Sequence, residues 1–217
     1  MNTLNITHAK DMLTYAADQI IDSLPLLTEI DSKTGDGDHG IGMAGGMKKA
    51  KEKLAGMEDC IDVYKLFAEA GKAMLMSMGG ASGVIFGTMY MGGAKGKEPK
   101  AELTPAELAA LLRDSLEAIK TRGKASVGDK TMVDALEPAV EAMEANAVQG
   151  LLPMLEAGEK AAAWGVEQTK AFQAKFGRAK SLMERAIGHQ DAGATSVWII
   201  IRSMREYVAE HAVEKGV

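Results

Sequence analysis

Internal disulfide bonds are excluded, because Cys60 is the only cysteine in the 217 residues. A lone thiol suits a reducing compartment. The sequence also lacks any apolar run of the ~18 residues that a membrane-spanning helix needs. Its first residues contain no basic segment followed by an apolar one, so we predict no signal peptide. We therefore expect a cytoplasmic protein that makes no membrane contact.

Basic residues are outnumbered as well. The chain has 25 lysines and arginines against 30 aspartates and glutamates, which gives a net charge of −5. A nucleic-acid-binding protein is expected to present a basic face, so we predict no direct nucleic-acid partner. The length is sufficient for one sizeable domain with its own core, and we expect residues 1–217 to form a single domain.

Apolar residues recur at helical spacing through most of the chain. The clearest stripe is Ile6, Ala9, Leu13, Ala16, Ile20 and Leu24. Thr104, Pro105 and Glu107 together predict a capped helix start. We expect helices over about residues 6–24, 43–54, 63–78, 104–120, 132–143 and 154–172, with a further helical run after Ser82.

Residues 196–202 are rich in β-branched and aromatic side chains, which locally favours a strand. No other segment offers a strand partner, and an isolated strand would leave its backbone groups unpaired. We therefore predict a helix here also. The sequence as a whole indicates an all-α fold of about eight helices without a convincing sheet.

Three aspartates, Asp31, Asp36 and Asp38, lie within eight residues of a glycine-rich stretch. Like charges this close repel one another, which is tolerable if they face solvent or if a cation neutralises them. Glycine allows several carboxylates to turn toward one point. Carboxylate ligands suit Mg²⁺. A Mg²⁺ site and a solvated acidic turn both remain open.

A calcium-binding EF-hand loop is excluded by the spacing. A loop that began at Asp31 would need glycine at its sixth position and glutamate at its twelfth, where Asp36 and Gly42 stand. A loop that began at Asp36 would place Met47 at its twelfth position.

A second glycine-rich stretch, residues 79–83, surrounds Ser82 before an apolar run. Free backbone N–H groups at a helix N-terminus attract anions, so this stretch could bind phosphate. Glycine also permits close helix packing, and both interpretations stay open. The stretch is not a Walker A loop, and the nearby Gly96-Lys97 pair is followed by Glu98 rather than Ser or Thr.

Three motifs carry a family resemblance over nearly the whole chain. They are Gly-Asp-Gly-Asp-His-Gly at residues 35–40, Gly-Gly-Ala-Ser-Gly at 79–83 followed by Phe-Gly-Thr at 86–88, and Gly-His-Gln-Asp-Ala-Gly-Ala-Thr at 188–195. In this order and separation the sequence resembles the L subunit of dihydroxyacetone kinases. The resemblance implies a closed barrel of eight antiparallel amphipathic helices that binds ADP or ATP and two Mg²⁺ ions in loops at one end.

The resemblance also implies roles for individual residues. Asp31, Asp36 and Asp38 match the magnesium ligands. Arg178 would stabilise charge on the transferring phosphoryl group, and Met132 would form an apolar wall for adenine. The implied nucleotide contacts are His39, Gly40, Ile41, Gly42, Ala81, Ser82, Gly123, Met132, Arg178, Asp191, Ala192 and Gly193. The alternatives are a surface ion pair for Arg178 and a hydrogen bond within the loop for His39.

The implied activity is phosphoryl transfer to a small ketose that a separate K subunit holds through a histidine. A chain without a fused K domain favours recharging from phosphoenolpyruvate by a phosphotransferase-system M subunit. The alternatives are an ATP-dependent kinase subunit for a tetrose such as erythrulose, a nucleotide-loaded module that regulates a transcription factor, or a helical adaptor. A homodimer is left open.

Two positions depart from the family pattern. Gly42 stands where many relatives have asparagine, and Ala192 replaces the usual proline of the Asp-Pro-Gly turn. These changes remove a side-chain hydrogen bond near the phosphates and a backbone restriction.

Overall fold

The computed structural model describes residues 2–212 and is built almost entirely of helices. Within that part the α-helices are α1 (Ile6–Asp22), α2 (Leu24–Ser32), α3 (His39–Ala55), α4 (Val63–Ser77), α5 (Gly80–Met91), α6 (Pro105–Gly123), α7 (Val133–Asn146), α8 (Leu151–Thr169) and α9 (Ala192–Ala212). The 3₁₀ segments are η1 (Gly92–Ala94), η2 (Ala147–Gln149) and η3 (Arg178–Ala186).

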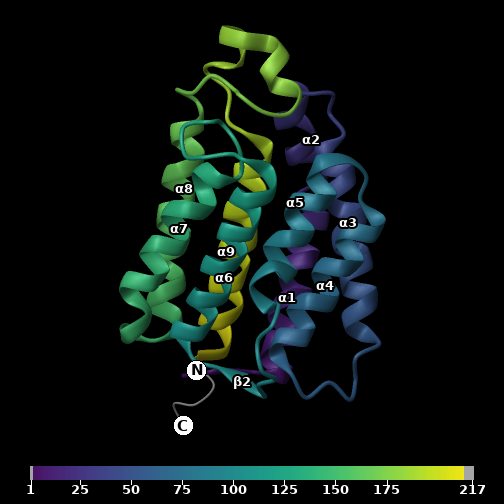
Figure 1. Ribbon diagram of the computed structural model, residues 1–217, viewed down its shortest axis with the longest axis vertical. Helices are drawn as coiled ribbons and strands as arrows, with labels where there is room; N and C mark the ends of the chain where they lie inside the picture. Colours follow the sequence, from purple (N-terminus) through teal and green to yellow (C-terminus); the bar gives the residue numbers. More distant parts are fainter. Residues whose placement is uncertain (1, 213–217) are drawn as a thin grey trace.

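The predicted all-α class is confirmed. Each long helix from α3 to α9 contacts the next one in sequence, and both α3 and α9 contact α1. The connections alternate between the two ends of the bundle, so the segments that follow α2, α4, α6 and α8 gather at the upper end in Figure 1. The closed barrel of eight helices remains a prediction.

Capping side chains mark the starts of α1, α4 and α6, where Asn5, Asp62 and Thr104 each accept a backbone N–H. The Thr104 hydroxyl accepts the Glu107 backbone N–H while the Glu107 carboxylate accepts the Thr104 N–H, which is the predicted capping box. Residues 196–202 lie inside α9, so the helical prediction there is confirmed. Pro138 lies inside α7, where it removes one backbone hydrogen bond of the helix.

Several boundary predictions were wrong, including that of α8, which spans Leu151–Thr169 rather than about residues 154–172. The helix expected over residues 6–24 ends at Asp22, and α2 begins at Leu24 with Pro25 in its first turn. A proline there suits the start of a new helix, because its missing N–H would be unpaired anyway. Helix α3 begins at His39 rather than near residue 43. Its glycines disfavour a helix, but a Cβ at Gly40 would lie 2.4 Å from the Thr28 Oγ1, so this glycine lets α3 pack closely against α2.

The prediction of no convincing sheet is confirmed, and the described residues add one very short strand pairing. Strands β1 (Leu4–Asn5) and β2 (Glu102–Leu103) pair antiparallel at the lower end in Figure 1. Each strand has only two residues, so no alternation of apolar and polar residues could have revealed it in the sequence. Leu4 and Leu103 are opposite each other and fully buried, so the pairing closes the core at this end.

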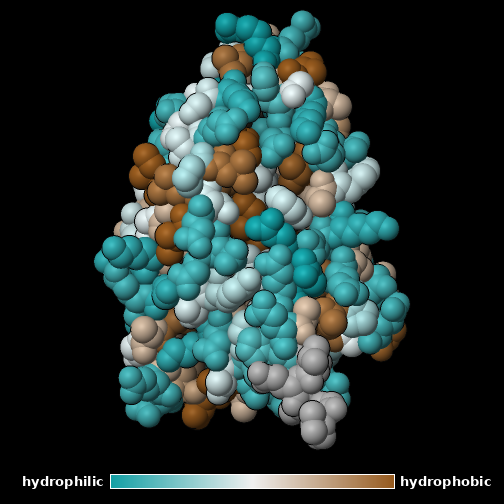
Figure 2. Space-filling model, turned by 180° about the vertical axis from the view of Figure 1, so that it is seen from behind, coloured by the Kyte–Doolittle hydropathy of each residue, from teal (hydrophilic) through white to brown (hydrophobic). Residues whose placement is uncertain are grey.

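The core consists mainly of aliphatic residues and methionine from all the long helices, with a few phenylalanines and tyrosines. Burying a side chain such as Leu66 stabilises the fold by roughly 1.5–3 kcal/mol. Seen from behind, the surface is mostly hydrophilic with apolar groups between the polar ones (Figure 2). No helix within residues 2–212 is long and apolar enough to cross a membrane.

Candidate functional site

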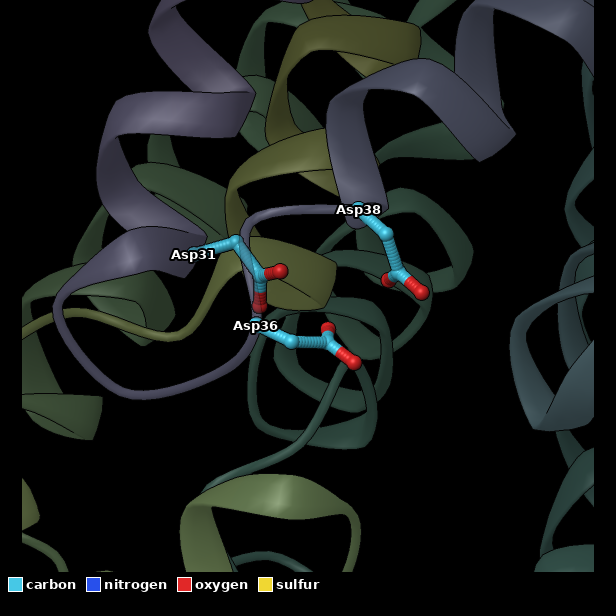
Figure 3. Close-up of side chains that lie close together, drawn as sticks. All are labelled: Asp31, Asp36 and Asp38. Carbon is cyan, nitrogen blue, oxygen red and sulfur yellow. The ribbon is translucent and has the colours of Figure 1, made fainter.

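The three predicted metal-ligating aspartates come together. One carboxylate oxygen from each of Asp31, Asp36 and Asp38 lies within 4.8 Å of the others. Asp31 lies in the last turn of α2 rather than in a loop, Asp36 follows in the connecting segment, and Asp38 directly precedes α3. Figure 3 shows the side chains of Asp36 and Asp38 directed toward the same open space, with Asp31 beside them. We call these residues the acidic cluster.

Two glycines make this tight turn possible. A Cβ at Gly35 would lie 2.4 Å from the Asp31 Oδ1, so any side chain there would displace that carboxylate oxygen. Gly37 has a φ of +78°, a left-handed conformation that costs other residues energy. The Gly35 N–H donates to the Asp31 carbonyl at 2.5 Å, which closes the turn onto the end of α2.

The electrostatics of the acidic cluster favour a cation. Burial, a hydrogen bond with Asp36 and the negative charges of Asp36 and Asp31 raise the pKa of the Asp38 carboxyl, while the Arg178 charge lowers it. A divalent ion among the oxygens would remove this repulsion. An all-carboxylate set that leaves room for water and phosphate oxygens fits Mg²⁺.

Arg178 lies beside the acidic cluster, as the resemblance implies. It begins η3, and its Nε forms an ion pair with the Asp36 carboxylate. Its side chain is 71% exposed, so the pair contributes little stability in water. An exposed guanidinium that pairs with Asp36 has further N–H donors with which it can bind a phosphate oxygen at this site.

An apolar pocket with a volume of about 330 Å³ lies between α5, α6 and the segment before α7. Three predicted nucleotide contacts line it: Ala81, Gly123 and Met132. The sequence did not single out Phe176 or Ile85, which also line it. The only signal for Phe176 in the sequence is that it is an aromatic residue two positions before Arg178. Size and lining suit a flat, apolar ring such as a nucleobase.

The pocket and the acidic cluster are neighbours. Gly177 lines the pocket, and the next residue, Arg178, pairs with Asp36. Ser82 follows the pocket residue Ala81 in the first turn of α5, where backbone N–H groups are free of helix partners. A ligand with an apolar ring at one end and phosphates at the other would span the two.

The His39 side chain points into the protein interior, unlike that of a residue whose ring contacts a nucleotide. Its ring is buried, and its Nε2 lies 2.8 Å from the Ser196 hydroxyl of α9. Burial lowers the pKa of the imidazole, while the Asp31 charge and a hydrogen bond to the Ala192 backbone raise it. The ring thus joins α3 to α9, and its backbone N–H donates to the Asp31 carboxylate at 3.3 Å. Gly40, Ile41 and Gly42 form the first turn of α3, and Ile41 is exposed.

Ala192 and Gly193 begin α9 on the other side of the pocket wall, and Asp191 directly precedes them. The Asp191 carboxylate accepts the Ala194 N–H at 2.7 Å and so caps the helix. A Cβ at Gly193 would lie 3.5 Å from the Met132 Cβ, which places this turn against the pocket. Burial raises the pKa of the Asp191 carboxyl to about 7.

The comparisons agree with this geometry. Residues 33–206 match the DAK2 domain family model. The chain is 38% identical over 204 residues to the "PEP-dependent dihydroxyacetone kinase, ADP-binding subunit DhaL" of Escherichia coli, covering 93% of this chain and 97% of that protein. It is 35% identical to "PEP-dependent dihydroxyacetone kinase 1, ADP-binding subunit DhaL" of Listeria innocua, covering 86% of this chain and 89% of that one.

A solved structure shares the fold. The dihydroxyacetone kinase of C. freundii in complex with AMP-PNP and Mg²⁺ matches with a TM-score of 0.72 and 24% identity, over 95% of this chain and 34% of that longer one. The predicted resemblance to the L subunit is thereby confirmed. The chain belongs to the DAK2 domain family.

Proposed function

We propose that this protein is the ADP- or ATP-binding subunit of a dihydroxyacetone kinase. Its role is to transfer a phosphoryl group from a magnesium-bound nucleotide to a small ketose held on a separate K subunit. The near-full-length similarity to two relatives named as ADP-binding subunits supports this proposal over an ATP-dependent kinase subunit for a tetrose or a helical adaptor.

The observation that carries the proposal is the continuity of three chemically distinct features. The acidic cluster, the exposed Arg178 and the apolar pocket follow one another through Gly177. A metal-binding site, a phosphate-binding cation and a base-binding surface are the parts that phosphoryl transfer from a nucleotide requires. A solvated acidic turn would need neither the exposed Arg178 nor the apolar pocket beside it.

In this proposal each residue has a physical task. Asp31, Asp36 and Asp38 hold Mg²⁺, two ions by the family resemblance, and bound Mg²⁺ supplies positive charge that neutralises the phosphates. Ser82 and the N-terminus of α5 donate hydrogen bonds to phosphate oxygens. Arg178 stabilises the charge that develops as the P–O bond to ADP breaks and the P–O bond to the ketose hydroxyl forms.

The remaining nucleotide contacts are assigned by position. Met132, with Ala81 and Gly123, holds the base. The backbone of residues 39–42 lies beside the phosphates, and residues 191–193 support the pocket from α9. We assign the whole chain to one domain that works with a K subunit and is recharged by a phosphotransferase-system M subunit, and we leave a homodimer as a question for solution measurements.

The first test is the nucleotide content of the purified protein. The protein is gel-filtered in Mg²⁺ without added nucleotide and then denatured, and released nucleotide is quantified. Near-stoichiometric ADP supports recharging from phosphoenolpyruvate, whereas an empty protein that binds ATP reversibly with Mg²⁺ supports an ATP-dependent kinase. A protein that binds neither nucleotide would contradict the proposal.

The second test is transfer itself. A K subunit loaded with dihydroxyacetone or erythrulose is added to the protein charged with γ-labelled ATP, and label in the ketose phosphate is measured. Transfer to dihydroxyacetone is expected to exceed transfer to erythrulose. A nucleotide-loaded protein that transfers label to neither ketose would be a binding module instead.

A further inference from the structure

Lys130 is a charged side chain that lies almost entirely inside the protein. It is 2% exposed, and it belongs to the segment that leads from α6 to α7. Its backbone has a φ of +60°, in the left-handed region that side chains other than glycine seldom adopt. Lysine is rarely buried completely, because removing its ammonium group from water costs energy.

The ammonium group connects two segments that are distant in sequence. The Lys130 Nζ donates to the Thr169 carbonyl at 2.5 Å, where α8 ends, and also to the His189 carbonyl, two residues before Asp191. These bonds use two of its three N–H donors. Burial lowers the pKa of Lys130, while the nearby charges of Asp191 and Asp134 raise it.

Further hydrogen bonds hold the same junction. The Asp191 N–H donates to the Thr169 hydroxyl at 2.9 Å, and the Gly188 N–H donates to the Lys170 carbonyl at 2.7 Å. The turn before α9 is therefore fixed onto the end of α8. Lys130 is the residue that fixes this turn to the segment before α7.

That connection bears directly on the pocket. Met132, two residues after Lys130, lines the pocket, and Gly193, two residues after Asp191, packs against Met132. Lys130 is two residues from Met132 in the chain, and its hydrogen bond to the His189 carbonyl holds the turn before α9. It therefore sets the distance between Met132, which lines the pocket, and the turn at the start of α9. A methionine or leucine would fill the same space without the cost of burying a charge, so packing alone does not explain a lysine here.

We infer that Lys130 is a positioning residue for the base-binding half of the nucleotide site. It acts through Met132 and the turn at residues 191–193, and it leaves the acidic cluster unaffected. The inference rests on the proposed function, since it assigns a nucleobase to the apolar pocket.

The test compares two probes on the wild-type protein and Lys130→Met, both first freed of bound nucleotide. Methionine has a similar length and keeps the same backbone demand, but it has no N–H donors. The probes are ADP with Mg²⁺ and inorganic pyrophosphate with Mg²⁺, followed by amide chemical-shift titration. We expect the Kd for ADP to rise about tenfold, which corresponds to ~1.4 kcal/mol, and the Kd for pyrophosphate to change less than twofold.

The matched control is Leu108→Ala. Leu108 is fully buried in the first turn of α6, roughly 22 Å along the helix from Gly123, so its loss destabilises the fold without touching the pocket. Both Kd values should stay at their wild-type levels. A change in the ratio of the two affinities therefore separates positioning from general loss of stability.

The failure modes are distinct. Wild-type protein that binds neither probe contradicts the proposed function. Wild-type binding with an unchanged ADP affinity in Lys130→Met, or an equal loss for both probes, overturns the role of Lys130 alone. If Lys130→Met does not fold, Lys130→Leu, which also lacks N–H donors, decides by the same ratio. Failure of both variants to fold assigns Lys130 to the fold and overturns the inference.

Discussion

The acidic cluster and the apolar pocket lie next to each other, yet different interactions hold them in place. The acidic cluster rests on an exposed glycine-rich turn whose three carboxylates repel one another. The pocket rests on the segment before α7, where the buried Asp134 accepts the Gly128 and Thr131 N–H groups at 2.6 Å each. Lys175, the residue before the pocket residue Phe176, adds an ion pair with the buried Asp129 at 2.6 Å.

This difference indicates how the acidic cluster and the pocket, the two halves of the proposed nucleotide site, respond to ligands. The pocket is fixed by hydrogen bonds that are already formed, so it needs little rearrangement to accept a base. The acidic cluster has carboxylates whose repulsion is only partly offset by Arg178, so a cation should stabilise it markedly. Mutations in the two halves should therefore differ in kind as well as in size.

The largest effect is expected from Asp38→Asn. Loss of one ligand should lower phosphoryl transfer at least 100-fold, because Mg²⁺ would no longer be held against the phosphates. Without Mg²⁺ the variant should be more stable than the wild type, since one repelling charge is gone. The measurements are label transfer with a K subunit and melting temperature with and without Mg²⁺.

The control for that experiment is Asp114→Asn. Asp114 is a carboxylate on α6 that pairs with Lys97 at 2.6 Å, outside the acidic cluster. The Asp114→Asn variant should retain phosphoryl transfer and the Mg²⁺-dependent rise in melting temperature. Near-normal transfer by Asp38→Asn would remove the metal assignment and leave a solvated turn.

Arg178→Lys should give the next largest effect. Lysine keeps the charge but loses the planar donor fork, and a lost donor to a developing oxyanion typically costs about 100-fold in kcat. The affinity for ADP with Mg²⁺ should change only a few-fold, because the exposed guanidinium contributes little to ground-state binding. Single-turnover transfer rates check this, with Arg185→Lys in the same η3 segment as the control. A rate within twofold of wild type would make Arg178 a surface ion pair.

Phe176→Ala probes the pocket half. Removal of an aromatic ring that stacks on a base typically costs about 1–3 kcal/mol, so the Kd for ADP should rise about tenfold. Pyrophosphate binding and Mg²⁺-dependent stabilisation should be unchanged. Isothermal titration calorimetry measures these affinities, and Phe172→Ala, outside the pocket lining, is the control. Equal losses for both ligands would show that the two halves are not separable.

The sequence was more informative about the acidic cluster than about the pocket. Three aspartates spaced by glycines are a local pattern, and Gly35 and Gly37 occupy the positions that the turn requires. Lys130 carries no such signal, because an isolated lysine is normally exposed and its burial depends on carbonyls 39 and 59 residues away.

The same reasoning explains the fold. Helix existence followed from apolar periodicity and from the Thr104 capping box, both of which are local. The early start of α3 depended on close packing of Gly40 against α2, which is a tertiary effect. The pairing of Leu4 with Leu103 joins residues too far apart for any local pattern to predict.

The smallest expected effect comes from Asp191, which caps the start of α9 beside the pocket. Burial, followed by the Asp134 and Asp31 charges, raises the pKa of Asp191 to about 7, against the lowering effects of the Ala194 N–H and the Lys130 charge. The folded protein therefore holds a proton there that the unfolded chain releases near pH 4.

The sign of the pH dependence follows from that difference. Between about pH 4 and pH 7 the folded state binds more protons at Asp191 than the unfolded state, so this group's contribution to stability is lost as pH rises through 7. Asp191→Asn removes the titration but keeps an oxygen that can accept the Ala194 N–H. Melting temperatures in EDTA should match the wild type near pH 4 and exceed it by a few degrees at pH 8. Parallel curves for the two proteins across this range would mean that Asp191 is already ionised at neutral pH and stabilises α9 as a charged cap.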